Sequence, residues 1–304
     1  MASTASVTVA VPCALGAAVA FAIANVEQMR AARRTEAPAE VSATLLVRLA
    51  RNRKWLIGLA TAVGGYGLQA IGLFLAPVVL VQPLIVTELL FALPMAAAYA
   101  GARLHAREWT GAVLVAAGIT AFLVVGNPSG DNAHISTFAT ISITAATGFA
   151  VVMLVLISET YASRPMIRAS GLAIAASVCF GMLSVMTKVV GRQFQHDKLA
   201  TLTHSQCYIL AAFAIAGLLL SQTSFRIAPL SVSLPLIDIG EPAVASLLAV
   251  LALHEHLDLG SGTAVGVALS ATTATLGVAL LDTSRNVHAM QEEVTAMVLE
   301  HTEA

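Results

Sequence analysis

The chain has 304 residues, of which 58% are hydrophobic and 11% are charged, far from the average composition of soluble domains. Its apolar runs are long enough to cross a bilayer, which takes about 20 residues each, so we predict an all-α integral membrane protein and exclude a soluble one. The formal net charge of −1 excludes the basic surface that nucleic acid requires, so no nucleic-acid partner is expected.

Nine apolar segments follow along the chain, each with the length of a membrane-spanning helix. They cover residues 7–25, 55–76, 79–102, 107–126, 134–158, 167–190, 205–227, 229–253 and 259–281. Segment 26–54 is expected to be a cytoplasmic loop. A basic stretch in its second half either anchors the topology, which we prefer, or lies on the membrane as an amphipathic helix. The tail 284–304 is expected to form a short cytoplasmic helix with an acidic face.

Lys and Arg are divided unequally between the two sides of these crossings. One side carries 13 of the 16: Arg30, Arg33, Arg34, Arg48, Arg51, Arg53, Lys54, Arg103, Arg107, Arg164, Arg168, Arg226 and Arg285. The other side has Arg192 and Lys198, with Lys188 near a helix end. Because basic loops stay in the cytoplasm, we predict a multi-pass protein of the cytoplasmic (inner) membrane with its N-terminus outside and its C-terminus in the cytoplasm.

A motif with two prolines occurs twice, 152 residues apart. Residues 76–85 and 228–237 both read A-P-x5-P-L-I, and each copy opens a long apolar run. Five predicted crossings separate the copies, and an odd number inverts the second copy in the membrane. Phe21 and Phe180, in the first helix of each half, extend the correspondence. We predict a 4+1+4 inverted repeat: a first repeat 1–126, a linking helix within 127–164, a second repeat 165–283 and the tail 284–304.

These residues also carry a family resemblance. The run Gly72–Leu84, followed by Trp109-Thr110-Gly111 and Gly118-Ile119-Thr120, resembles the drug/metabolite transporter superfamily. The form A-P-x-x-L-V-x-P-L is similar to its NIPA-type magnesium transporter branch, and Gly181–Lys188 resembles a serine-valine…lysine stretch of that branch. The resemblance covers most of 7–281 and implies an EamA-like fold and membrane transport, with Mg²⁺ as the cargo of the branch.

Three acidic residues lie inside predicted spans. A charge at the bilayer centre costs about 2.5–3.5 kcal/mol, so each is a candidate for function. Glu88 lies nine residues into a helix expected to start at Val79, and Asp238 and Glu241 reach similar depth in the matching helix. We expect the three to line one central cavity and to bind the substrate or a metal ion. The alternative is that they are protonated or paired and serve only packing.

Other polar groups rank below these carboxylates. Pro94 and Pro242 free the backbone carbonyls of Leu90 and Asp238, which adds oxygen ligands near the acids. Candidates to line the path are Gln69, Gln82 and Thr87, with Asn25, Gln28 and Tyr66 ranked lower. Interhelical hydrogen bonding is the alternative for all of them. His254, Glu255 and His256 form a weaker candidate for collecting a divalent metal, against the alternative of a solvated loop.

These features together predict a secondary transporter that moves a cation, Mg²⁺ by resemblance, or a small solute by alternating access. Two alternatives stay open: a proton-coupled exporter of an organic amine or metabolite, and a non-transporting membrane protein that supports envelope assembly. The sequence contains no phosphate-binding loop or ATPase motif, so neither an enzyme nor a cofactor is expected. The expected partners are the lipid bilayer, a small-molecule or ion substrate and, as an open alternative, a second copy of the chain in a homodimer.

Overall fold

The computed structural model describes residues 4–35, 41–75, 84–99, 101, 104–126, 135–196, 204–253 and 261–282. Within these residues every regular element is an α-helix. The helices are α1 Thr4–Arg34, α2 Ala43–Leu49, α3 Arg53–Leu75, α5 Glu88–Tyr99, α6 Ala106–Gly126, α7 Thr137–Thr160, α8 Pro165–His196, α9 Ser205–Ile227, α10 Leu230–Leu253 and α11 Ser261–Asp282.

Seven helices of the described residues are long and apolar enough to cross a membrane, namely α1, α3, α7, α8, α9, α10 and α11. The stretch Leu84–Tyr99, which contains α5, is apolar but shorter. Apolar side chains cover the outer surfaces of these helices, including Phe138, Phe149 and Leu269. The chain is therefore an all-α, multi-pass membrane protein.

The first helix is longer than predicted. The expected loop over 26–54 is wrong in its first part, because α1 continues through the three arginines to Arg34. Val26, Met29 and Ala32 are buried on one face of this extension. A hydropathy criterion ends a span at the first charges, whereas packing of one apolar face prolongs the helix.

Two further boundaries differ from the prediction. The second half of the expected loop contains α2, whose Leu45 and Leu49 pack against Ala31 and Trp55, so protein contacts hold it. The helix α8 continues past Lys188 to His196, so this lysine is not at a helix end. The predicted start of a helix at residue 79 lies outside the described residues.

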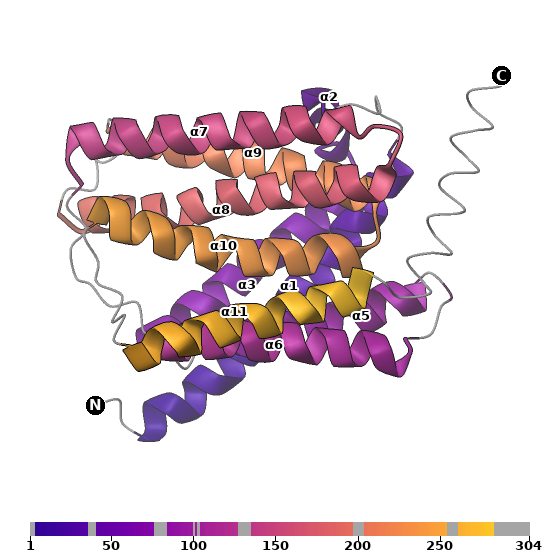
Figure 1. The fold of residues 1–304 in the computed structure, drawn as a ribbon, viewed down its shortest axis with the longest axis horizontal. Coiled ribbons are helices and arrows are strands. Elements are labelled where there is room, and N and C mark those ends of the chain that lie inside the picture. The colour runs from indigo at the N-terminus through magenta and orange to yellow at the C-terminus, as the bar shows by residue number, and fades with distance from the viewer. Residues whose placement is uncertain are drawn as a thin grey trace.

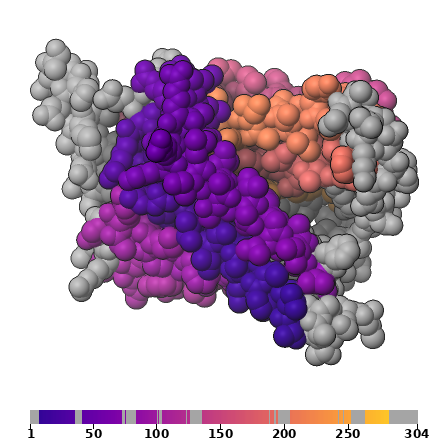
Figure 2. Space-filling model, turned by 180° about the vertical axis from the view of Figure 1, so that it is seen from behind, coloured from indigo at the N-terminus to yellow at the C-terminus, as the bar shows by residue number. Residues whose placement is uncertain are grey.

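The helices pack in a small number of extensive pairs: α1 with α3, α6 with α11, and α8 with both α9 and α10. In Figure 1, α7, α8 and α9 lie along one side of the molecule, α6 and α11 lie along the opposite side, and α10 runs between them. From behind, the indigo and violet residues of α1 and α3 cross the face diagonally beside the orange residues of α9 (Figure 2).

One end of the bundle carries Arg30, Arg33 and Arg34 of α1, and we call it the arginine-rich end. The C-terminal end of α5 lies there, as shown by the hydrogen bonds that Arg30 and Arg34 donate to the Tyr99 hydroxyl. The start of α10 lies there too, since Arg33 donates to the Ala228 carbonyl just before this helix. The helices α5 and α10 therefore run in opposite directions.

The helices α6 and α11 are also antiparallel, and glycines let their backbones approach. The site of a Cβ at Gly111 is 2.8 Å from Leu281, and that at Gly118 is 2.5 Å from the backbone nitrogen of Ala274. As the residue number rises along α6, it falls along α11. Contacts this close leave no room for a side chain, which is typical of small residues at membrane helix crossings.

Candidate functional site

A central cavity of about 430 Å³ lies between α1, α3, α5, α6, α8, α9 and α10. Its lining includes Phe21, Asn25 and Gln28 of α1, Tyr66 and Gln69 of α3, Glu88 of α5, Phe180 and Ser184 of α8, Ser221 and Phe225 of α9, and Asp238 and Glu241 of α10. Aromatic and aliphatic side chains make up most of this wall. A few polar groups converge in it, which is the composition of a small-molecule site.

Two of the three carboxyl groups in this cavity, those of Glu88 on α5 and Asp238 on α10, lie close to each other. Two buried carboxyl groups this close can share one proton, because one carboxylate accepts a hydrogen bond that the protonated partner donates. Asp238 Oδ2 is buried and has no hydrogen-bond partner among the described residues. The pair thus presents a buried acceptor without a partner beside a second carboxyl group.

The third carboxyl group is held by a different helix. Ser184 Oγ of α8 donates to Glu241 Oε1 at 2.9 Å. Glu241 lies three residues after Asp238, so both acids occupy one face of α10. The serine hydroxyl orients the Glu241 carboxyl group by bonding one of its two oxygens. The site therefore combines a close pair of carboxyl groups with a third carboxyl group that is held separately.

The backbone at Glu88 is interrupted. Leu84–Val86 are helical, Thr87 forms a turn, and α5 then begins at Glu88. Both the amide and the hydroxyl of Thr87 donate to the Leu84 carbonyl. Irregular backbone at membrane depth is tolerated where it is buried in protein or lines a cavity. The turn places Glu88 at the cavity, 7% exposed.

Two glycines let α10 approach α8 closely at the level of the acids. The site of a Cβ at Gly240 lies 2.2 Å from Ser177 Oγ, and that at Gly181 lies 2.7 Å from Val244. Gly240 stands between Asp238 and Glu241 along the chain. Its small size fixes the distance of α10 from α8, which holds both acids at the cavity.

A buried amide layer lies on the arginine-rich side of the cavity. Gln222 Nε2 donates to Gln28 Oε1 at 2.7 Å, and Trp55 Nε1 donates to Gln222 Oε1 at 3.1 Å. Gln222 is fully buried, and its amide finds partners on α1 and α3. A satisfied buried network of this kind fixes the relative placement of its helices.

The walls formed by α1 with α3 and by α8 with α9 repeat one contact. The Phe21 ring lies on Gly65, where a Cβ would be 2.8 Å away, and the Phe180 ring lies on Gly217, where it would be 2.7 Å away. The two glycines are 152 residues apart, the same separation as the two copies of the proline motif. Each wall therefore uses a phenylalanine in a glycine notch.

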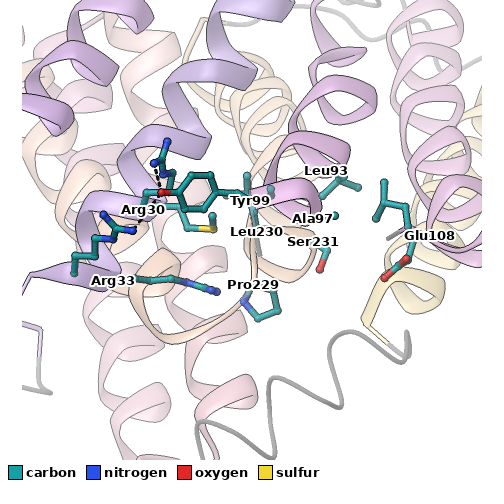
Figure 3. A pocket seen from close by; sticks show the side chains of 13 residues that line it. Arg30, Arg33, Leu93, Ala97, Tyr99, Glu108, Pro229, Leu230 and Ser231 are labelled. Carbon is teal, nitrogen blue, oxygen red and sulfur yellow. Dashed lines mark hydrogen bonds between the residues drawn. The ribbon is translucent and has the colours of Figure 1, made fainter. Parts of the chain in front are cut away.

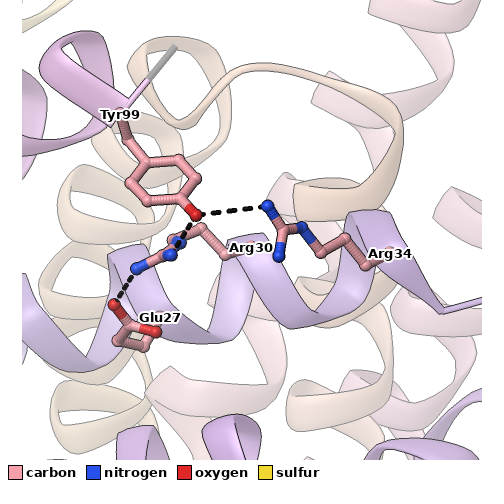
Figure 4. A network of polar contacts seen from close by, with 4 residues as sticks. All are labelled: Glu27, Arg30, Arg34 and Tyr99. Carbon is pink, nitrogen blue, oxygen red and sulfur yellow. Dashed lines mark hydrogen bonds and ion pairs between the residues drawn. The ribbon is translucent and has the colours of Figure 1, made fainter.

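A smaller cavity of about 220 Å³ lies at the arginine-rich end between α1, α5, α6 and α10. Figure 3 shows Arg30 and Arg33 on one side of it and Glu108 on the other. Arg30 pairs with Glu27 and donates to the Tyr99 hydroxyl, to which Arg34 donates at 3.3 Å (Figure 4). This network ties the end of α1 to the end of α5.

The residues predicted from the sequence are placed as follows. Glu88, Asp238, Glu241 and Gln69 line the central cavity, as do Asn25, Gln28 and Tyr66. Thr87 is not among the lining residues, because its hydroxyl is turned to the Leu84 carbonyl. Gln82 and His254, Glu255 and His256 lie outside the described residues. Among the described residues, no group of three His, Cys, Asp or Glu is arranged to hold a metal ion.

Sequence reasoning did not predict roles for Ser184, Ser221 or Phe225, which also line the cavity. A signal for Ser184 was present in the chain. It follows Phe180 by four residues, as Asn25 follows Phe21. No comparable pattern marks Ser221 and Phe225, because α9 places them there through its packing.

No protein-family model matches the chain, and no solved structure matches it. An uncharacterised protein of Corynebacterium glutamicum is 30% identical over 259 residues, which cover 84% of this chain and 89% of that protein. With such identity over most of both chains, this protein belongs to the same family as the Corynebacterium glutamicum protein.

Proposed function

We propose that the protein is a proton-coupled secondary transporter of a small organic cation. The buried pair of Glu88 and Asp238, in a cavity lined mostly by aromatic and aliphatic groups, is the observation that carries this proposal. We infer that the two carboxyl groups share one proton. Burying carboxyl groups at bilayer depth costs free energy, and a purely structural membrane protein gains nothing in return for that cost. For the same reason we set aside the alternative of a non-transporting protein that supports envelope assembly.

The proposed architecture is the 4+1+4 inverted repeat of the drug/metabolite transporter superfamily, with α5 and α6 as the remaining spans. In this scheme α1, α3, α5 and α6 correspond to α8, α9, α10 and α11. The opposite directions of α5 and α10, the antiparallel α6 and α11, and the matching Phe21 and Phe180 contacts support it. Alternating access then comes from rocking of the two halves about the central cavity.

The orientation proposed from the basic residues places the arginine-rich end in the cytoplasm and the N-terminus outside. We expect a cysteine replacing Asn132, which lies outside the described residues, to react with impermeant thiol reagents from outside. A cysteine replacing Ser163, in the exposed turn between α7 and α8, is expected to be protected. The measurement is labelling of intact cells in a variant without Cys13, Cys179 and Cys207. Labelling with the reverse pattern would overturn the topology.

The proposed coupling is an exchange at the carboxyl pair. A cationic substrate enters the aromatic-lined cavity, its ammonium group binds the carboxylate oxygens including Asp238 Oδ2, and the shared proton leaves to the side from which the substrate came. One proton and one substrate charge then replace each other. In the opposite conformation the substrate leaves and a proton returns, so the acids are never left as uncompensated buried anions.

A second candidate cargo is Mg²⁺, which the resemblance to the NIPA-type branch favours and which three carboxyl groups in one cavity support. Mg²⁺ requires a compact octahedral set of oxygens and keeps several waters. The described acids are not clustered in that way, and much of the wall is aromatic and aliphatic. We therefore rank the organic cation first. A homodimer stays a prediction.

Transport in proteoliposomes separates these candidates. We expect an imposed pH gradient to drive the accumulation of small protonated amines and quaternary ammonium ions, with protons leaving the vesicles as these cations enter. We expect no uptake of Mg²⁺ and no proton movement when Mg²⁺ is added. The control is the same lipid without protein. Uptake of Mg²⁺ in the absence of proton movement would favour the second candidate, and the absence of all fluxes across the panel would contradict both.

A further inference from the structure

We propose that the cargo is a cation that also carries an uncharged hydrogen-bond acceptor, and that Gln28 recognises this acceptor. This inference rests on the proposed transport function and adds a second contact for the cargo. The first contact joins the ammonium group to Glu88, Asp238 and Glu241. The second lies on the arginine-rich side of the same cavity, which Gln28 also lines.

The orientation of the Gln28 amide is fixed by a chain of hydrogen bonds that starts at a group able only to donate. The indole Nε1 of Trp55 is this group, and it donates to Gln222 Oε1 at 3.1 Å. The other end of the Gln222 amide, Nε2, donates to Gln28 Oε1 at 2.7 Å. Gln28 Nε2, with its two hydrogens, is therefore the end of this amide that has no partner among the described residues.

Packing holds the members of this chain in place. Gln222 is fully buried, and Trp55 and Gln28 are 4% and 6% exposed. The stem of Gln28 lies against Gly58 of α3, where the site of a Cβ is 3.2 Å from Gln28 Cγ. Because Gln28 lines the cavity and its oxygen is taken by Gln222, its amide hydrogens serve the cavity. The cavity thus has a donor of fixed orientation at this level.

Two other amides line the cavity without such a chain. No hydrogen bond among the described residues fixes which end of the Asn25 or Gln69 amide faces the cavity. Either side chain can therefore turn its oxygen or its nitrogen to the cargo. Of the three amides, only Gln28 selects an acceptor over a donor.

The Gln28 donor and the acids lie at different depths in the cavity. The ring of Phe21 on α1 contacts that of Tyr66, with centroids 4.9 Å apart, and Tyr66 lies near all three acids. Gln28 follows Phe21 by seven residues, which is about 10 Å along a helix. A molecule that contacts both sites must carry its acceptor several bonds from its ammonium group. An α-amino acid is too short to do so.

The charges on the wall determine which kind of acceptor fits. The described residues that line the central cavity include three acids and no Lys, Arg or His. A carboxylate or phosphate on the cargo would be buried there without a counterion, which is costly. A carbonyl or ether oxygen accepts from Gln28 without adding a charge. The inferred substrates are amines or quaternary ammonium ions with a neutral oxygen acceptor at the far end of the molecule.

Binding of a matched pair of ligands to the protein in detergent tests this contact. The pair is hexyltrimethylammonium and the same cation with a ketone oxygen in place of the two hydrogens next to its terminal methyl group. Isothermal titration calorimetry gives the affinity of each. We expect the ketone to bind about three- to tenfold more tightly, the usual effect of one neutral hydrogen bond. The analogue that ends in a carboxylate is expected to bind more weakly than either.

Two variants show whether Gln28 is responsible for this preference. Gln28→Met keeps the length of the side chain without its amide, and it is expected to abolish the preference by weakening ketone binding alone. Trp55→Phe frees Gln222 to turn over, so Gln28 can present either end of its amide. The preference is then expected to fall towards one while both cations still bind. The matched control is Trp109→Phe on α6, at the other tryptophan, which is 42% exposed and is expected to keep the full preference.

The ratio of the two affinities is decisive, because both ligands carry the same charge. Equal affinities in the unaltered protein, or a full preference in folded Gln28→Met, would overturn this inference and leave the proposed function intact. If Gln28→Met does not fold, a full preference in Trp55→Phe overturns it instead. Tighter binding of the carboxylate analogue overturns the requirement for an uncharged acceptor. If none of these cations binds, the proposed organic-cation cargo is wrong, and this inference fails with it.

Discussion

Glu88→Gln is expected to give a folded, membrane-inserted protein whose proton-coupled transport falls to the level of empty liposomes. Gln has nearly the shape of Glu and can still donate a hydrogen bond to Asp238, so the cavity keeps its geometry. It cannot release a proton, and it removes one of the charges that a cation would bind. Asp238→Asn and Glu241→Gln are expected to act in the same direction, the first by removing the other member of the pair and the second by removing the carboxyl group held by Ser184.

Stability measurements distinguish this role from packing. Crowded buried acids destabilise the fold, so amides of the same size are expected to leave the thermal midpoint in detergent unchanged or raise it by a few degrees. A role in packing alone predicts a lower midpoint with transport retained. The matched control is Asp282→Asn, at the end of α11, for which neither quantity should change. Normal transport in the triple variant Glu88→Gln, Asp238→Asn, Glu241→Gln would end this account of the site.

Gly118→Ala is expected to lower the free energy of unfolding by about 1–3 kcal/mol, the usual cost of overpacking, and Gly118→Val by more. The added Cβ would lie 2.5 Å from the backbone nitrogen of Ala274 and 2.8 Å from its Cα. Backbone atoms cannot move aside as a flexible side chain can, so α6 and α11 must separate. Because apolar surface gains little from association inside lipid, close van der Waals contact is most of what holds this pair together.

Thermal or denaturant unfolding in detergent checks this expectation. Gly67→Ala on α3 is the matched control, since nothing lies within 4 Å of its Cβ position. Alanine has the higher helix propensity by up to about 1 kcal/mol, so this control is expected to be neutral or slightly stabilising. Equal stability of Gly118→Ala and Gly67→Ala would mean that α6 and α11 do not cross as the structure has them.

Several features of the protein were readable in the sequence because they depend on local properties of the chain. The length of an apolar run decides whether it spans a membrane, and the span predicted at 205–227 coincides with α9, Ser205–Ile227. Proline spacing marked the two related segments before any contact was known. The three acids were found because a charge at bilayer depth is costly wherever it lies. The role of these acids and the repeat itself stay proposals.

Other features depend on which helices meet, and only the tertiary structure decided them. The extension of α1 to Arg34 comes from burial of one face against its neighbours, which a hydropathy window does not register. The interruption at Thr87 is set by backbone geometry. The approach of Glu88 to Asp238 and the bond from Arg33 to the Ala228 carbonyl join groups that are distant in the chain. Apolarity places each helix in the membrane, but it is nearly uniform along the helix surfaces and gives no partner. Small residues and buried hydrogen bonds determine which helices pack together, and they act only once two helices are in contact.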